Sequence, residues 1–126
     1  MNPTGYTART MSDLYGAGST YDGQPFIAES FYVVIENLAG RRFAHRVRFR
    51  SAERHYCEET GEPYFSNLRE VASGKAERLA ERVNAAIAAG KALNDAYWYE
   101  IDPAYGSDEY QAQGVEFERA LADREG

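Results

Sequence analysis

Residues 43–50 read Phe-Ala-His-Arg-Val-Arg-Phe-Arg, and this stretch decides the fold. Apolar side chains and one imidazole occupy the odd positions, while alanine and arginines occupy the even ones, a period of two that is typical of a β-strand with one buried face. Upstream, residues 31–36 are aromatic and β-branched, and residues 37–40 end in a glycine suited to a positive-φ turn position. The two stretches are therefore predicted to form an antiparallel β-hairpin.

The flanks of the hairpin show no comparable pattern. Residues 1–25 contain four glycines, two prolines and three tyrosines without a period of 2 or 3.6 residues, which predicts a flexible N-terminal arm. Residues 51–65 contain a glycine, a proline and a cluster of glutamates, which predicts a loop. The chain length corresponds to one domain, which we place at residues 26–126.

A long helix is predicted between Asn67 and Gly90. Glu70 follows Asn67 by three residues, as in a capping box, and Gly90 suits a helix C-terminus. Gly74 in the interior leaves two alternatives open, a kink at this glycine or a helix that begins at Ser73. Apolar residues recur between these ends at helical spacing: Leu68, Val71, Ala72, Leu79, Ala80, Val83, Ala86 and Ile87.

The last part of the chain predicts one more strand and one more helix. Residues 97–101 are aromatic and end at Asp102-Pro103, which indicates a third strand. Ser107 is placed to cap a helix over residues 108–123. The resulting order predicts an α+β fold, in which a small antiparallel sheet (the β-hairpin plus a third strand) packs on one long helix, with a C-terminal helix.

Composition excludes several classes of protein. The 126 residues carry 20 acids and 14 lysines or arginines, a formal net charge of −6. A single cysteine, Cys57, excludes an intramolecular disulfide framework and a four-cysteine metal site. The longest uninterrupted apolar runs, 31–35 and 85–89, have only five residues each, so no membrane span and no membrane partner is expected. The N-terminus has no apolar signal region, and the expected compartment is the cytoplasm.

No residue set predicts catalysis, a metal or a cofactor. His45 falls on the apolar face of its strand, which favours a half-buried, hydrogen-bonded side chain over a base. His55 and Cys57 leave open a thiolate pair, but two residues adjacent in a loop are weak evidence for a nucleophile and its base. Metal-ligand spacings and phosphate-binding glycine loops are missing from the sequence. We therefore expect a non-enzymatic protein without cofactor or metal.

Charge is concentrated in two segments of opposite sign. Residues 37–54 contain six arginines against one acid, whereas residues 95–126 contain nine acids against two arginines. The basic candidates for partner binding are Arg42, Arg46, Arg48 and Arg50. On one strand face these side chains repeat about every 7 Å, and their repulsion requires acids or an anionic partner.

Three kinds of partner could neutralise the arginines. Acids of the C-terminal segment or of the helix would neutralise them within the chain, and an acidic protein surface would do so between chains. A nucleic acid is the third, with Tyr32, Tyr56 and Tyr97 as stacking surfaces, although the net charge of −6 opposes it.

The acidic segment is a second candidate surface, and the other interpretation of it is a solubilising tail. Carboxylates and tyrosines together would suit a basic, nucleic-acid-binding groove on a partner. Its candidate residues are Glu100, Asp102, Asp108, Glu109, Glu116, Glu118, Tyr105 and Tyr110.

Residues 31–45 and 101–110 resemble small phage or prophage accessory proteins. The resemblance implies a non-enzymatic inhibitor that binds a host defence protein or nucleoprotein complex in the host cytoplasm, as anti-CRISPR proteins do, and it transfers no site residue. The alternatives are a small nucleic-acid-binding domain that uses the arginine strand, and an enzyme centred on His55 and Cys57. Small residues at Ala72, Ala76 and Ala80 also leave a homodimer through the helix open.

Overall fold

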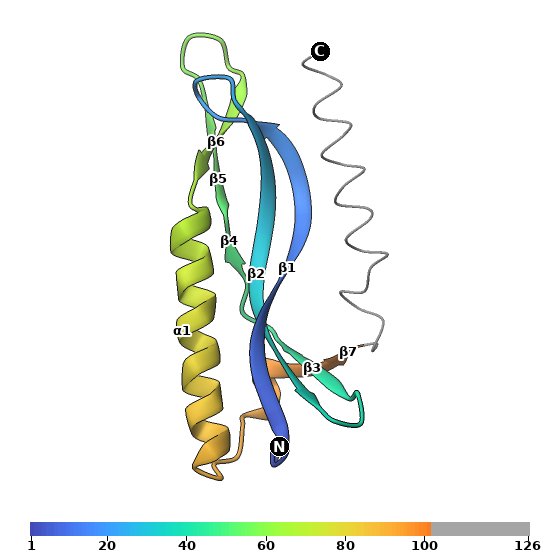
Figure 1. The fold of residues 1–126 in the computed structure, drawn as a ribbon. Coiled ribbons are helices and arrows are strands. Elements are labelled where there is room, and N and C mark those ends of the chain that lie inside the picture. Colours follow the sequence, from blue (N-terminus) through green and yellow to red (C-terminus); the bar gives the residue numbers. More distant parts are fainter. Residues whose placement is uncertain (102–126) are drawn as a thin grey trace.

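The structure is a computed structural model that describes residues 1–101, and over these residues it is an α+β fold of antiparallel strands and one long helix (Figure 1). The predicted fold class and the packing of a sheet on a long helix are confirmed. The predicted C-terminal helix at residues 108–123 lies outside the described residues.

Two long strands form the main ribbon of the molecule. β1 (Tyr6–Ser19) pairs antiparallel with β2 (Pro25–Asn37) along its whole length, with one irregularity between Leu14 and Gly16. The expectation of an N-terminal arm without regular structure over residues 1–25 is therefore wrong over residues 6–19. β1 is poor in large apolar residues, and pairing with β2 together with burial of Ala8 outweighs its weak strand propensity.

The predicted hairpin exists, but its second strand is interrupted. β3 (Arg42–His45) and β4 (Phe49–Arg50) both pair with β2, and Gly40 adopts φ +84° in the turn before β3. Val34 lies opposite Ala44 and Phe31 opposite Phe49, so two residues of β2 face the four residues 45–48. Residues 46–48 consequently leave the ladder as a bulge, and the prediction of one continuous strand over 43–50 is wrong there.

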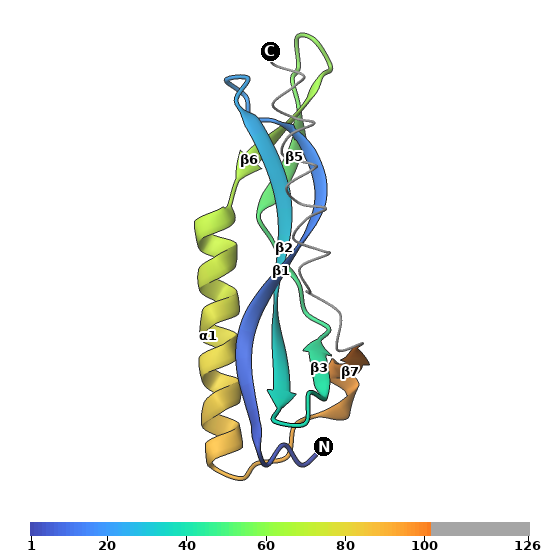
Figure 2. The same cartoon turned by 45° about the vertical axis from the view of Figure 1, so that its right-hand side comes forward.

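The predicted third strand is confirmed as β7 (Trp98–Ile101), which follows the short 3₁₀-helix η1 (Asp95–Tyr97). β7 pairs antiparallel with β3 and completes the strand order β1-β2-β3-β7. Figure 2 shows β3 and β7 on the side of the long ribbon away from the helix.

Residues 51–65 were predicted to be a loop, and this prediction is wrong. β5 (Ala52–Tyr56) and β6 (Pro63–Asn67) form a second antiparallel hairpin, and only the residues between them are a turn. Phe65 is the apolar anchor of this hairpin, since it is buried against Phe26 and Ala28 of β2. A single large apolar side chain among glutamates was too weak a periodic signal to reveal these strands.

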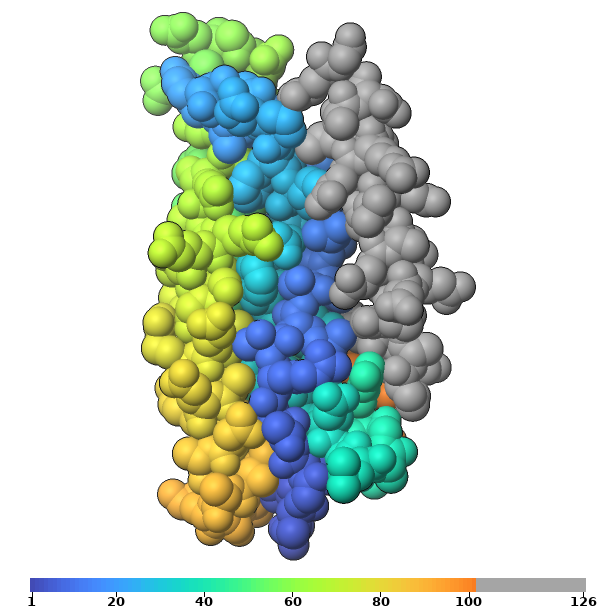
Figure 3. Space-filling model, in the orientation of Figure 1, coloured from blue at the N-terminus to red at the C-terminus, as the bar shows by residue number. Residues whose placement is uncertain are grey.

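The long helix is confirmed as α1 (Arg69–Ala88), and it runs without interruption through Gly74. Its buried residues are Ala72, Ala76, Ala80 and Val83. They pack on Phe31, Val33 and Ile35 of β2 and on Ala8 of β1, so the alanine positions considered for dimerisation are used inside the chain. In Figure 3 the upper part of the helix lies beside β2 and its lower part lies beside β1.

The alternation along β2 gives the sheet two different faces. Odd-numbered residues of its central part face α1, whereas Tyr32 and Val34 face the other way and cluster with Ala44, Tyr99 and Ile101. Both faces are buried at β2, where Tyr32 and Val34 have no exposed surface. Among residues 1–101 no helix has the length and apolarity that a membrane span needs.

Candidate interaction surface

Arg48 is the centre of the face of the sheet opposite α1. The guanidinium carbon of Arg48 lies 3.6 Å from the centroid of the Tyr32 ring, and one of its nitrogens is 3.3 Å from a carboxylate oxygen of Asp13. A second nitrogen donates a hydrogen bond to the Tyr99 hydroxyl. The Tyr32 hydroxyl donates to Asp13 at 3.4 Å. Side chains from β1, β2 and β7 thus converge on one arginine of the bulge.

Two more arginines lie on the same face over tyrosine rings. The guanidinium of Arg46 is 5.2 Å from the ring centroid of Tyr99, and that of Arg50 is 5.6 Å from the ring centroid of Tyr15. Both arginines are exposed, and neither has an ion-pair partner within residues 1–101. We call this surface the arginine–tyrosine face; its members are Arg46, Arg48, Arg50, Tyr15, Tyr32 and Tyr99.

A charge cluster borders the arginine–tyrosine face near the β2–β3 turn. Glu36 accepts hydrogen bonds from Arg9 at 2.7 Å and from Arg42 at 3.0 Å. The hydrogen bond from Arg9 and the positive charges of both arginines outweigh the opposing effect of burial and lower the pKa of Glu36. Glu36 is therefore held as a carboxylate between two strands.

The predicted basic residues gather on one face, as the alternation indicated. Arg42, Arg46, Arg48 and Arg50 are all directed to the side of the sheet away from α1, through their contacts with Glu36, Tyr99, Tyr32 and Tyr15. Within the described part of the chain, the acids that contact them are Glu36 of β2 and Asp13 of β1. The helix glutamates, one of the predicted partners, are not among them, and the predicted C-terminal acids beyond residue 101 lie outside the described residues.

Most of the predicted acidic surface lies outside the described residues: Asp102, Tyr105, Asp108, Glu109, Tyr110, Glu116 and Glu118. Glu100 is described, and it accepts two hydrogen bonds from Arg41, at 3.0 and 3.2 Å. The hydrogen bond from Arg41 lowers the pKa of Glu100. Glu100 is therefore engaged within the chain.

The tyrosines proposed for base stacking are separated in the structure. Tyr32 lies beneath Arg48, Tyr97 stacks on His45 with ring centroids 5.7 Å apart, and Tyr56 is an exposed residue of β5. They do not form one stacking surface.

His45 is buried and hydrogen-bonded, as predicted. Its Nδ1 accepts a hydrogen bond from the Val47 amide at 3.1 Å, and Trp98 packs edge-on against its ring. Burial lowers the pKa of His45 and favours the neutral imidazole that this hydrogen bond requires. Its role in the structure is to shape the bulge at residues 46–48.

His55 and Cys57 are not joined by a hydrogen bond in the described structure. His55 stacks on Tyr64 and lies 3.7 Å from Glu53. The Cys57 thiol is hydrogen-bonded to Thr60, which lowers the pKa of the thiol. No group of three or more potential metal ligands occurs among residues 1–101. These contacts give no geometry for a nucleophile and its base.

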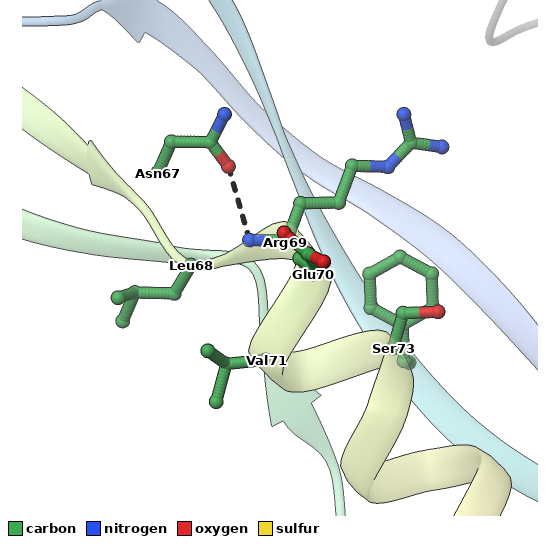
Figure 4. Close-up of a pocket in the computed structure, with 7 residues that line it drawn as sticks. Asn67, Leu68, Arg69, Glu70, Val71 and Ser73 are labelled. Atoms are coloured by element: carbon green, nitrogen blue, oxygen red, sulfur yellow. Dashed lines mark hydrogen bonds between the residues drawn. The ribbon is translucent and has the colours of Figure 1, made fainter.

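A shallow groove of about 550 Å³ lies beside the first turn of α1 (Figure 4). Leu68 and Val71 contribute exposed apolar side chains, and Asn67 accepts a hydrogen bond from the Arg69 amide at 3.0 Å. Asn67 thus helps to start the helix, as predicted, although Leu68 is the N-cap residue. The charged groups along the groove are Arg69 and Glu70, and Arg69 is paired with Glu29 at 3.1 Å.

The sequence analysis missed Tyr15 and Tyr99, which belong to the arginine–tyrosine face, and Asp13, which forms an ion pair with Arg48. The alternation of Arg9, Met11, Asp13 and Tyr15 would have placed the β1 residues on one face if β1 had been recognised as a strand. Tyr99 falls on this face because β7 pairs with β3, and that pairing has no local sequence signal.

The comparisons identify no relative: no family model matches the chain, and no curated protein and no solved structure matches it.

Proposed function

We propose that the protein acts by binding, without catalysis, and that the arginine–tyrosine face contacts an acidic surface of a host protein complex. The observation that carries the proposal is the pair of exposed arginines, Arg46 and Arg50, each over a tyrosine ring beside the anchored Arg48.

Stacked arginines suit protein recognition for a physical reason. A guanidinium over an aromatic ring keeps its N–H edge available for a carboxylate, and the ring limits the rotamers that binding would otherwise have to freeze. Arginine and tyrosine are also enriched among the residues that contribute most to protein–protein binding. Arg46 and Arg50 therefore supply two directed cations at low entropic cost.

Charge favours a protein partner over a nucleic acid. Binding to nucleic acid through its phosphates depends on lysines and arginines that neutralise them, and the affinity rises with the number of phosphates neutralised. The arginine–tyrosine face exposes two arginines without ion-pair partners in the described chain, and the whole sequence carries a net charge of −6. An acidic patch on a protein requires fewer cations and tolerates this net charge.

The resemblance to phage accessory proteins supplies the class of partner. It supports a stoichiometric inhibitor of a host defence nucleoprotein complex, in the manner of anti-CRISPR proteins, and this assignment stays a prediction. The acidic surface of residues 100–118 is the other surface through which such an inhibitor would bind.

A capture experiment with matched charge reversals tests the proposal. The tagged protein is incubated with a nuclease-treated bacterial lysate, and bound proteins are quantified by mass spectrometry. The variant R46E/R50E is compared with R78E/R82E, which makes the same change in charge on the exposed side of α1. We expect a stoichiometric complex that R78E/R82E retains and R46E/R50E loses. Equal capture by both variants, or capture that depends on nucleic acid, would contradict the proposal.

A further inference from the structure

β1 is an edge strand whose outer side is only partly covered. The strand order places β1 at one end of the sheet, and no other strand of the described chain pairs with its outer side over residues 6–14. Edge strands with unpaired backbone groups are templates for a further strand, and folded proteins normally block them. In this protein the outer edge of β1 is blocked at one residue.

Asn84 of α1 provides that block at Ala8. Its side-chain oxygen accepts a hydrogen bond from the Ala8 amide at 2.8 Å, and its side-chain nitrogen donates to the Ala8 carbonyl at 3.0 Å. The Asn84 amide thus replaces a neighbouring strand for one residue. Both backbone groups of Ala8 must point outward to make these bonds.

The orientation of Ala8 fixes that of the next residues. In an antiparallel pair, alternate residues direct both backbone groups to the same side. Thr10, Ser12 and Leu14 therefore point their N–H and C=O groups away from β2, and the described chain gives these groups no hydrogen-bond partner. Ser12 and Leu14 are exposed. The open row is three residues long and centred on Ser12.

We propose that a second copy of this chain pairs with the row, β1 against β1, antiparallel about a two-fold axis at Ser12. This register sets Ser12 opposite Ser12 and Thr10 opposite Leu14 of the second copy. It satisfies the outward groups of all three residues on both chains and leaves the Asn84 contact with Ala8 intact. The inference does not depend on the function proposed above.

Side chains along β1 favour the same register. Arg9 lies opposite Tyr15 of the second copy, and Asp13 lies opposite Met11, so no two like charges are opposed. Arg9 and Asp13 of the second copy are diagonal neighbours at roughly 7–8 Å, within reach of a long side chain. The charges on β1 of one copy thus complement those on β1 of the other, and an isologous dimer requires such self-complementarity.

The substitution Ser12→Pro distinguishes this dimer from a dimer formed through any other surface. The Ser12 amide points outward, so a proline there removes no hydrogen bond of the β1–β2 ladder, and edge strands tolerate proline in this position. We expect the wild type and S12A to sediment with increasing concentration toward twice the chain mass of 14.2 kDa. We expect S12P to remain a monomer over the same range, roughly 1–300 μM, which brackets a micromolar Kd.

Hydrogen exchange of the wild type gives a second test that does not depend on the folding of S12P. The amides of Thr10, Ser12 and Leu14 should become protected as concentration rises. A monomer at every concentration overturns the proposal: if these amides exchange freely, the edge is open, and if they are protected throughout, another part of the chain covers it. Dimerisation of S12P to the same extent as S12A also overturns the proposal, because a different surface is then used.

Discussion

Arg48 lies 3.6 Å from the ring centroid of Tyr32 while its guanidinium also contacts the carboxylate of Asp13. The cation, the ring and the carboxylate come from three separate chain segments. Asp13 is paired with Ser30 of β2, two residues before Tyr32, and the bulge at residues 46–48 brings the arginine over both. The contact therefore joins the bulge to the long ribbon and fixes the centre of the arginine–tyrosine face.

Replacement of Arg48 should destabilise the fold more than replacement of Arg46. We expect R48A to lower the free energy of unfolding by about 1–3 kcal/mol, because it removes a close cation–π contact and leaves Asp13 with one ion pair fewer. R46A removes an exposed contact and should cost less than about 1 kcal/mol. Urea denaturation measures both values. Equal losses would contradict the anchoring role of Arg48.

Glu36 should make stability depend on pH in the acid range. The pKa of Glu36 is lowered in the folded protein, so ionised Glu36 stabilises the fold. This stabilisation is fully present above the pKa that Glu36 has in the unfolded chain, about 4.3, and it is lost as the pH falls through the pKa of the folded state. The side chain is partly exposed, so we expect E36Q to cost less than about 1 kcal/mol at pH 7.

The difference between wild type and E36Q should shrink as the pH is lowered from about 6 to about 3. Urea midpoints across this range measure it. E77Q, at an exposed glutamate of α1, is the matched control and should show no such trend. A difference that stays constant with pH would show that the two arginines do not act on Glu36 as described.

Asn84 should contribute to the stability of the fold although it is an exposed residue. N84A removes both hydrogen bonds to the backbone of Ala8, which is a buried residue. We expect this to lower the free energy of unfolding by about 1–3 kcal/mol. N67A removes one exposed hydrogen bond at the start of α1 and should cost less. Thermal unfolding compares the two. A smaller loss for N84A than for N67A would be inconsistent with the strand-like role of Asn84.

Gly18 and Gly16 form a matched pair for a test of packing at the second hairpin. A Cβ at Gly18 would lie 2.6 Å from Cε2 of Phe65, whereas a Cβ at Gly16 would meet no atom within 4 Å. Phe65 is buried, so we expect G18A to cost about 1–3 kcal/mol by displacing it. G16A should be close to neutral or slightly stabilising. Similar unfolding midpoints for both variants would contradict the packing of Phe65 against β1.

The elements with strong local signals were predicted from the sequence. α1 has many apolar positions at helical spacing, and residues 31–36 and 43–45 alternate with large apolar side chains. β1, β5 and β6 were missed because their strand character depends on partners. β1 gains its order from β2 and Asn84, and β6 gains it from the burial of Phe65 among residues distant in sequence.

The candidate surface was predicted in part. Alternation placed Arg42, Arg46, Arg48 and Arg50 on one face, and the structure agrees. The tyrosines beneath Arg46 and Arg50 were missed, because β1, which carries Tyr15, was not recognised as a strand, and because Tyr99 reaches the face through the β3–β7 pairing. Pairing between distant strands is a tertiary property, and local patterns do not encode its register.

Binding by the arginine–tyrosine face is the central claim, and its most direct test is the affinity of R46E/R50E for a purified partner complex obtained by capture. Isothermal titration without nucleic acid measures this affinity for the wild type, R46E/R50E and R78E/R82E. We predict one-to-one binding by the wild type and R78E/R82E, with R46E/R50E weakened by about a hundredfold or more, as expected when two directed charge contacts are reversed. Unchanged affinity of a folded R46E/R50E would contradict the claim and transfer the binding role to another surface of the chain.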